Sequence, residues 1–592
     1  MRPEAEELGG IGNLVEALHR NAVGRGGKGA LHRKVGGRWE AVSYGELYGM
    51  VRDFAAGLAG LGVGRGDRVG LIARNRVEWA VTDFAVQSLG AATVPVYPTL
   101  EPEQVAHILA DCEARVVVVE DGELLGRVSS ARGELPALEH VVVMEGEGAT
   151  LFEEVLREGR ERPLEGWEEG WRSLGREDVA TIIYTSGTTG RPKGAVLTHG
   201  NILSNLEGIQ DALTVYPEDV FLSFLPLSHV FERTCGQFLA LGVGASVYYA
   251  ESVEKVPENL REVRPTVMPS VPRLYEKMHD RVRAMVAGGS PVKRWLFGRA
   301  VAAGRRRYEV LDRGGRPGLP LRAALAVYDR LVFRRLREAV GGRVRFFVSG
   351  GAKLDAEVGK FFYAAGIKIM EGYGLTETSP VIACNRLEKP RFGTVGLPLS
   401  NLEVRISPEG EIQVRGPSVM RGYFRDERST EEAFTQDGFF RTGDIGSFDE
   451  GGYLTVTDRL KSLIVLSTGK NVAPQPIESA LVTAPHISQA VVVGEGRKYV
   501  SALVVPDYRA VRATLGVGGT DEELAGDGRV QRLIEREVEK ATRGFADYER
   551  PKKVALLPRE LSQEAGELTP TLKVKTRVVQ RRYGGYIERL YA

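Results

Sequence analysis

Cysteine is scarce in this chain. Cys112, Cys235 and Cys384 are its only cysteines, and no two of them are spaced as a C-x-x-C pair. Thiols so few and so far apart argue against a zinc site and against a disulfide framework. We therefore expect the protein to work in a reducing compartment, the cytoplasm.

Long apolar runs and an excess of charge of one sign are also lacking. The sequence has no uninterrupted run of about 18 apolar residues, so no membrane-spanning helix is expected. Its 79 Lys and Arg residues are matched by 78 Asp and Glu residues. This balance gives no global field that would attract nucleic acid, and no nucleic-acid partner is expected.

Short apolar, β-branched runs alternate with amphipathic stretches along the chain. The clearest runs lie at residues 116–119, 141–143, 181–184 and 344–348. Buried strands that alternate with helices are typical of α/β proteins with mainly parallel sheets. We predict an α/β fold whose large N-terminal domain contains parallel-rich sheets flanked by helices.

At 592 residues the chain should hold more than one domain. A strand-like run at residues 453–457 ends before Asp458-Arg459-Leu460-Lys461, and an apolar run resumes at Leu463. This short joint predicts an N-terminal domain of residues 1–460 and a small α+β C-terminal domain of residues 461–592.

The predicted C-terminal domain has its own strand and helix signals. Residues 489–493 and 499–505 resemble two strands joined by a turn, and Pro476 is expected to begin a helix. Both patterns favour a compact unit.

One segment departs from the charge balance. Residues 281–345 contain 17 Lys or Arg against 4 Asp or Glu, with apolar residues at roughly helical spacing among them. Helices that rest on anionic surfaces have this pattern, so peripheral contact with anionic lipid at the inner face of a membrane is one interpretation. A solvated helical face packed on the domain is the other.

The most informative motif follows a strand-like run at residues 179–183. It runs from Tyr184 to Gly194 and is rich in glycine and hydroxyl groups, with Thr185, Ser186, Gly187, Thr188, Thr189 and Gly190. Glycines let backbone N–H groups turn towards an anion, hydroxyls donate to phosphate oxygens, and Lys193 adds a compact positive charge. Because Arg191 follows Gly190, the Walker A order is absent and a P-loop NTPase is disfavoured. The stretch predicts a phosphate-binding loop of another kind.

With this loop, the chain resembles the adenylate-forming superfamily of acyl-CoA synthetases, aryl-CoA ligases, firefly luciferase and peptide-synthetase adenylation domains. Phe224-Leu-Pro-Leu-Ser-His-Val-Phe-Glu-Arg and Gly469-Lys-Asn-Val-Ala-Pro-Gln-Pro-Ile-Glu are most similar to long-chain fatty acyl-CoA synthetases. The resemblance implies that ATP activates a fatty acid as its acyl-adenylate. CoA then forms the thioester, and AMP and pyrophosphate are released. The implied partners are the fatty acid, ATP and CoA.

The resemblance also implies where the nucleotide binds. Besides the phosphate loop, the implied contacts are Gly350, Gly351, Ala352, Gly372, Tyr373, Gly374, Asp444 and Arg459. Tyr373 is expected to stack on adenine, Thr376 to contact the α-phosphate, and Asp444 to accept from the ribose hydroxyls. Glu377 and Thr185 are expected to bind Mg²⁺, which takes one or two carboxylates plus phosphate oxygens in such sites.

Three further roles follow from the same resemblance. His229 is expected to line the acyl pocket, and Lys461 to be the hinge about which a mobile C-terminal domain turns. Lys573 matches the lysine that enters the active site during adenylation, with Lys575 as the alternative because Leu572 stands where many relatives have glycine. The implied catalytic residues are Lys193, Thr376, Glu377 and Lys573.

Several activities share these motifs. The alternatives are a CoA ligase for a medium-chain or aryl acid, a luciferase-like enzyme, and a catalytically silent nucleotide-binding relative. A silent relative would be expected to lose Glu377, Asp444 or Lys573, and all three positions carry the expected residue type. Acyl chain length stays open, as does the oligomeric state, with a homodimer as one alternative.

Overall fold

The computed structural model describes residues 8–185, 192–459, 463–468, 470–562, 564–568 and 574–591. The chain divides into two compact units. The first comprises residues 1–405, 413–441 and 452–454, and the second residues 406–412, 442–451 and 455–592. The predicted α/β class is confirmed. The predicted boundary at 460/461 lies outside the described residues and stays a prediction.

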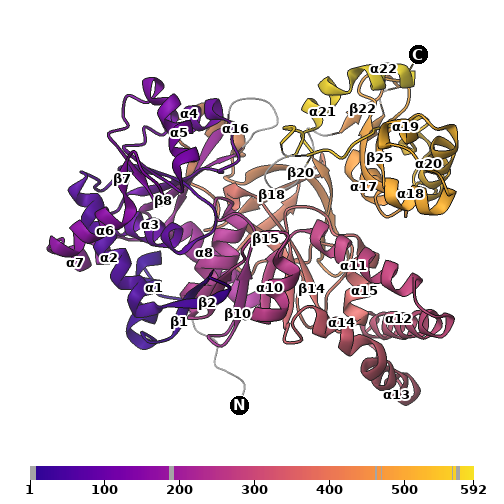
Figure 1. Ribbon diagram of the computed structural model, residues 1–592, viewed down its shortest axis with the longest axis horizontal. Coiled ribbons are helices and arrows are strands. Elements are labelled where there is room, and N and C mark those ends of the chain that lie inside the picture. Colours follow the sequence, from indigo (N-terminus) through magenta and orange to yellow (C-terminus); the bar gives the residue numbers. More distant parts are fainter. Residues whose placement is uncertain are drawn as a thin grey trace. The chain divides into compact units, whose positions relative to one another are not determined.

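The first unit contains a nine-stranded sheet of order β16-β15-β14-β13-β12-β10-β11-β1-β2 (Figure 1). Its inner strands are parallel. They are β14 (Ile369–Gly374), β13 (Phe346–Ser349), β12 (Val267–Ser270), β10 (Val220–Ser223), β11 (Ser246–Tyr249) and β1 (Gly29–Val35). The antiparallel strands at its edges are β2 (Arg38–Ser43), β15 (Val381–Cys384) and β16 (Leu397–Pro398).

A second sheet of the same unit has eight strands in the order β19-β9-β8-β4-β3-β5-β6-β7. Its parallel strands are β8 (Val179–Thr185), β4 (Ala92–Pro95), β3 (Arg68–Ile72), β5 (Val116–Val119), β6 (His140–Val143) and β7 (Thr150–Leu151). The antiparallel strands are β9 (Lys193–Thr198) and β19 (Gly422–Tyr423). β4 and β5 are buried along their length, as expected of parallel strands covered on both faces.

Two helices lie between these sheets. α3 (Val77–Ser88) contacts β1 of the nine-stranded sheet and β3 and β4 of the eight-stranded sheet. All twelve of its residues are buried. α8 (His199–Ala212) likewise contacts β9 and β15, and the Thr198 side chain caps its N-terminus. The two sheets therefore share one core.

The predicted strands are confirmed with one displacement. Residues 116–119, 141–143 and 181–184 lie in β5, β6 and β8, but β13 begins at Phe346 rather than at residue 344. Its neighbour β12 begins at Val267, which pairs with Phe346, so the residues before Phe346 have no strand beside them.

The basic segment is helical, as predicted. It contains the end of α11 (Pro272–Ala287), then α12 (Pro291–Asp312), α13 (Leu319–Tyr328) and α14 (Arg334–Ala339). α12 packs on α15 (Ala356–Ala364) so closely that a Cβ at Gly304 would lie 2.3 Å from the Ala364 Cβ. Among the described residues, no helix combines the length and the apolar character needed to cross a membrane.

The second unit contains a sheet of β24 (Ile487–Val493), β25 (Ser501–Pro506) and β26 (Val554–Leu556). Alternate residues of β24 and β25 face two separate cores, one with α17 (Pro474–Leu481) and α20 (Gly528–Ala541), the other with α21 (Thr576–Arg582) and α22 (Gly584–Tyr591). The two predicted strands are confirmed, and they pair in antiparallel orientation. The predicted helix begins at Pro474 rather than Pro476, because proline is tolerated throughout a first turn, where N–H groups have no intrahelical partner.

Candidate active site

Several of the predicted residues of the first unit lie at one edge of the nine-stranded sheet. β10, β12, β13 and β14 are neighbouring parallel strands, so their carboxyl ends meet at the same edge. His229 follows β10, Gly350 to Ala352 follow β13, and Tyr373 to Glu377 lie at the end of β14. Ligands of open α/β sheets bind in the crevice outside such carboxyl ends.

Glu371 fixes the Gly350–Leu354 turn to β14. Its buried side-chain Oε1 accepts a hydrogen bond of 2.9 Å from the Leu354 N–H. Burial raises the pKa of Glu371 to about 8. The turn also needs glycine, because Gly351 has a φ of +80° and a Cβ at Gly350 would lie 2.9 Å from the Phe231 ring. Phe231 thereby brings the His229 segment against the turn.

The ring nitrogens of His229 have distinct roles. Its Nδ1 accepts a hydrogen bond of 3.0 Å from the Phe231 N–H. A neutral imidazole that accepts at Nδ1 carries its proton on Nε2. This nitrogen is then a hydrogen-bond donor.

Glu377 is held from two sides by the segment that contains β19. Its side-chain Oε1 accepts a hydrogen bond of 3.0 Å from the Tyr423 hydroxyl, and its backbone oxygen accepts one of 2.7 Å from the Met420 N–H. Glu377 is 9% exposed. Burial raises the pKa of Tyr423, and the negative charge of the nearby Glu377 carboxylate raises it further. The Tyr423 hydroxyl therefore keeps its proton and remains a hydrogen-bond donor.

The phosphate loop begins and ends in a β-hairpin. Thr185 at the end of β8 pairs with Lys193 at the start of β9. Ser186, Gly187, Thr188, Thr189 and Gly190 lie outside the described residues. The Lys193 Nζ lies 5.3 Å from the centroid of the Tyr423 ring and donates to the Ser429 Oγ at 2.5 Å. Tyr423 therefore contacts both Lys193 and Glu377.

The sequence patterns missed Tyr423 and Ser429. Tyr423 lies on a two-residue strand, and Ser429 on α16 (Glu427–Ala433), 46 and 52 residues after Glu377. The glycine of Gly422-Tyr423 is the one sequence signal at this position. Glycine is needed there because Gly422 adopts a φ of +153° and a Cβ would lie 2.8 Å from the Thr430 side chain. The pairing of this glycine with β9 places the next residue beside Lys193.

In the second unit, the structure brings Asp444 and Arg459 together. Asp444 lies on β20 (Phe440–Phe448) and is 3% exposed, and its Oδ1 lies 3.1 Å from the Arg459 Nε on β21 (Leu454–Arg459). Its N–H donates to the Thr442 Oγ1 at 3.1 Å. Lys461 lies outside the described residues.

Lys573 also lies outside the described residues, but both flanks of its segment are described. Leu568 and Val574 form an antiparallel bridge, and the Lys575 N–H donates to the Glu567 backbone oxygen at 2.8 Å. The buried Glu567 carboxylate accepts hydrogen bonds from Arg559, Arg582 and Tyr583 at 2.6, 3.0 and 3.0 Å. Glu567 thus anchors the segment that contains Lys573.

Comparison with known proteins identifies the family. Residues 18–424 match the model described as AMP-binding enzyme, and residues 461–592 match the model described as AMP-binding enzyme C-terminal domain. The chain belongs to the AMP-binding enzyme family. The resemblance predicted from the motifs is thereby confirmed.

Named relatives of this AMP-binding enzyme agree with that assignment. The chain is 40% identical over 569 residues to long-chain-fatty-acid–CoA ligase FadD15 of Mycobacterium bovis, covering 94% of each chain. It is 32% identical over 559 residues to long-chain-fatty-acid–CoA ligase 1 of Homo sapiens, covering 88% of this chain and 78% of that one. The crystal structure of ATP-bound MatB from Rhodopseudomonas palustris aligns with a TM-score of 0.72 and 25% identity, covering 96% of this chain and 99% of MatB.

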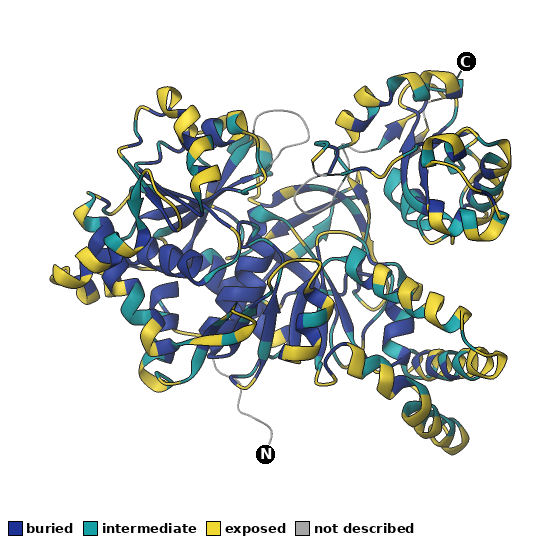
Figure 2. Ribbon diagram, viewed as in Figure 1, coloured by how far each residue is buried: buried dark blue, intermediate teal, exposed yellow. Residues whose placement is uncertain are grey.

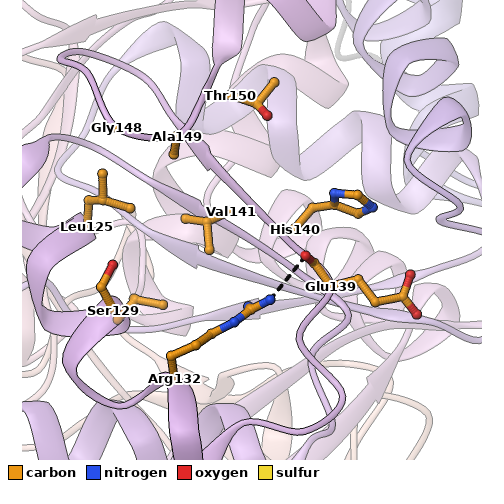
Figure 3. A pocket seen from close by; sticks show the side chains of 10 residues that line it. Leu125, Ser129, Arg132, Glu139, His140, Val141, Gly148, Ala149 and Thr150 are labelled. Atoms are coloured by element: carbon orange, nitrogen blue, oxygen red, sulfur yellow. Dashed lines mark hydrogen bonds between the residues drawn. The ribbon is translucent and has the colours of Figure 1, made fainter.

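A cavity elsewhere in this AMP-binding enzyme is separate from the predicted residues. It has a volume of about 400 Å³ and lies beside β6, β7 and α5 (Gly122–Ser130) (Figure 3). Arg132, on its lining, donates to the Glu139 backbone oxygen at 3.2 Å. None of the predicted site residues lines it. Nor do the described residues contain a group of three or more His, Cys, Asp or Glu that could hold a metal ion.

The Glu567 anchor predicts a pH-dependent stability. Burial raises the pKa of Glu567, but hydrogen bonds from Arg559 and Arg582 outweigh it and lower the pKa to about 2. A carboxylate with a lowered pKa stabilises the fold above its unfolded pKa of about 4.5, and this stabilisation is lost as pH falls towards 2. We expect Glu567→Gln to destabilise the second unit by about 3 kcal/mol at pH 7, and the difference from wild type to vanish near pH 2.

Pepsin cleavage around α21 and α22, followed from about pH 4.5 down to about pH 2, measures this difference. Glu564→Gln, a change at an exposed carboxylate in the same segment, is the control and should leave cleavage unchanged. Equal behaviour of the two variants would contradict the anchoring role.

Proposed function

We propose that this chain is a long-chain fatty acid–CoA ligase. It activates the acid with ATP as an acyl-adenylate, then forms the CoA thioester and releases AMP and pyrophosphate. The observation that carries the proposal is the 40% identity over 94% of the chain to a named long-chain-fatty-acid–CoA ligase. The contacts of Glu377 and Lys193 with Tyr423 support it.

Two displacements make up the reaction. A carboxylate is a poor acyl donor, because its leaving group would be oxide. One carboxylate oxygen therefore attacks the α-phosphorus of ATP, the bond to the β-phosphate oxygen breaks, and pyrophosphate leaves. The CoA sulfur then attacks the carbonyl carbon of the mixed anhydride, its proton is lost, and AMP leaves. Catalysis consists mainly of positioning and of stabilising charge on phosphate oxygens.

The first unit would hold the nucleotide at the carboxyl edge of its nine-stranded sheet. In this proposal Tyr373 stacks on adenine beside Gly350 to Ala352, and Thr376 donates to the α-phosphate. Lys193 and the phosphate loop bind the outgoing pyrophosphate oxygens. The His229 Nε2–H donates to the substrate carboxylate and orients it. The fixed turn at Gly350 and the buried Glu371 support this arrangement.

Glu377 and Thr185 fit Mg²⁺ as ligands. One oriented carboxylate and one hydroxyl are hard oxygen donors, and Mg²⁺ in such sites completes its shell with phosphate oxygens and water. The Tyr423 hydroxyl at 3.0 Å fixes the orientation of the Glu377 carboxylate. When bound, the ion supplies positive charge that neutralises phosphate oxygens.

Tyr423→Phe tests this orientation. Loss of the hydroxyl removes one hydrogen bond that orients Glu377, and partners of metal ligands typically contribute 10- to 100-fold to metal affinity. We expect the Mg²⁺ concentration for half-maximal pyrophosphate release to rise about tenfold. Tyr44→Phe is the control. It also removes a hydroxyl that donates one hydrogen bond, to the Ala245 backbone oxygen at 2.6 Å, but Tyr44 is not one of the predicted site residues. A response of Tyr423→Phe no larger than that of the control would remove Tyr423 from the site.

The second unit would supply the ribose and adenylation contacts. Asp444 accepts from the ribose hydroxyls, Arg459 contacts the nucleotide, and Lys573 enters the active site during adenylation. Residues 461–592 then turn about Lys461 to admit CoA. The ion pair of Asp444 with Arg459 and the separate family match of residues 461–592 support these roles.

Pyrophosphate release with Mg·ATP, measured with and without CoA over a series of acids, tests the function. Strong CoA-dependent turnover on palmitate and oleate is the expected result. Turnover confined to medium-chain or aryl acids would overturn the substrate assignment and keep the chemistry. Light emission with luciferin would favour a luciferase-like enzyme, and absence of any turnover a silent relative.

A cytoplasmic location accompanies this function. All three cysteines are free and buried, which suits a reducing compartment.

A further inference from the structure

Exposed apolar side chains concentrate in one part of the first unit. We call residues 281–345 the basic arm. Among the described residues, 13 large apolar side chains are strongly exposed, and six of them lie in the arm. They are Met285, Val292, Trp295, Leu319, Val327 and Leu331. Isolated exposed apolar residues are normal, but such a concentration marks an interaction surface.

α12 has two faces of different character. One face packs on α15, with Phe297 against Phe361 and Ala300 fully buried. The opposite face carries Val292 and Trp295, which are 71% and 65% exposed. Arg299 and Arg306 continue the same face at helical spacing and are also exposed. The outer face is therefore apolar at its start and cationic beyond it.

α13 extends this surface. None of its residues is buried, and Leu319 and Val327 are 77% and 55% exposed. Arg322 and Arg330 lie beside them and are exposed. Figure 2 shows exposed residues along most of α12 and α13.

The positive charge of the arm is largely uncompensated. Of its 17 Lys and Arg residues, four form ion pairs: Arg305, Arg334, Arg337 and Arg345. The other 13 form none with any described residue. A surface with this excess attracts anions.

We propose that the basic arm is a docking surface for an anionic lipid bilayer. Guanidinium groups pair well with lipid phosphates, while Trp295 and the apolar residues enter the boundary between headgroups and acyl chains. A second copy of this chain fits poorly, because a two-fold interface would place the uncompensated arginines against the same set. Nucleic acid would leave the apolar residues exposed. This inference goes beyond the proposed function and does not depend on which acid is activated.

Tryptophan fluorescence of the full chain tests the proposal. Of five tryptophans, Trp79, Trp167 and Trp171 are buried, Trp39 is half-buried, and only Trp295 is strongly exposed. Vesicles of phosphatidylcholine with phosphatidylglycerol should shift the emission to shorter wavelength, and vesicles of phosphatidylcholine alone should not. Trp295→Phe should abolish the shift.

Charge reversal measures the electrostatic part. Arg299→Glu combined with Arg306→Glu should weaken cosedimentation with the anionic vesicles by at least about 30-fold, because loss of two cationic contacts alone accounts for that factor. The control is Arg532→Glu with Arg536→Glu, two exposed arginines on α20, which should bind as wild type does. Turnover of palmitate in the absence of vesicles should be unchanged in both, so failure of docking and failure of the proposed function give different results.

Three outcomes would overturn the proposal. They are equal binding to neutral and anionic vesicles, an unchanged affinity of the Arg299/Arg306 variant, and a dimer in sedimentation that Trp295→Phe dissociates. Equal loss of binding in the α20 control would also count against the arm.

Discussion

Lys573→Ala is expected to slow acyl-adenylate formation about 100- to 1000-fold, the loss typical when one donor to a developing oxyanion is removed. Negative charge moves on to the phosphate oxygens as pyrophosphate departs, and the ammonium group would stabilise it in a site that excludes water. Thioester formation from supplied acyl-adenylate should change far less, because in the proposed mechanism Lys573 acts only in the first displacement. Single-turnover measurements of the two half-reactions separate these effects.

Lys575→Ala is the matched control. Lys575 contacts Glu567 through its backbone N–H and precedes α21, so truncating its side chain leaves that hydrogen bond in place. We expect near-normal adenylation. A large loss in Lys575→Ala with little in Lys573→Ala would assign the adenylation role to Lys575.

Arg233→Met is expected to destabilise the first unit by about 3 to 5 kcal/mol, because it leaves a buried carboxylate without its partner. The side chains of Arg233 and Asp83 are 1% and 0% exposed. The Arg233 Nε donates to the Asp83 Oδ2 at 2.9 Å, and its Nη1 to the Thr181 Oγ1 at 2.7 Å. This pair ties the Phe224–Arg233 motif to α3 and β8.

Denaturant unfolding followed by tryptophan fluorescence reports this loss, since all five tryptophans belong to the first unit. Adding Asp83→Asn to Arg233→Met should recover part of the stability, because the unpaired charge is removed. Arg428→Met is the control: its side chain is 89% exposed in a pair with Glu432, and a change below about 1 kcal/mol is expected. Equal losses at Arg233 and Arg428 would contradict the argument.

The sequence predicted those parts of the fold and site whose signals are local. A run of valines is sufficient for β5, and the strand-like run at residues 179–183 is sufficient for β8. The first residue of β13 depends on where the neighbouring strand begins, and the first residue of α17 depends on the geometry of a first helical turn. No local sequence pattern contains either. The contact of Tyr423 with Glu377 joins segments 46 residues apart in sequence, and only the pairing of β19 with β9 brings them together.

Arg233 is a residue whose motif could be recognised in the sequence but whose role could not. It belongs to the motif that most resembles long-chain synthetases, but its guanidinium is buried in an ion pair away from solvent. A residue of such a motif can therefore contribute to packing rather than to chemistry. His229 in the same motif has its Nδ1 engaged by the Phe231 backbone N–H.

The complete burial of α3 has a consequence for how this chain tolerates change. Most helices offer a solvent-facing side on which substitutions cost little, but none of the twelve positions of α3 does. Thr82, Asp83 and Gln87 there are as enclosed as Trp79 and Phe84. Random mutagenesis selected for folding should therefore find α3 almost invariant, while the outer face of α13 accepts nearly any residue.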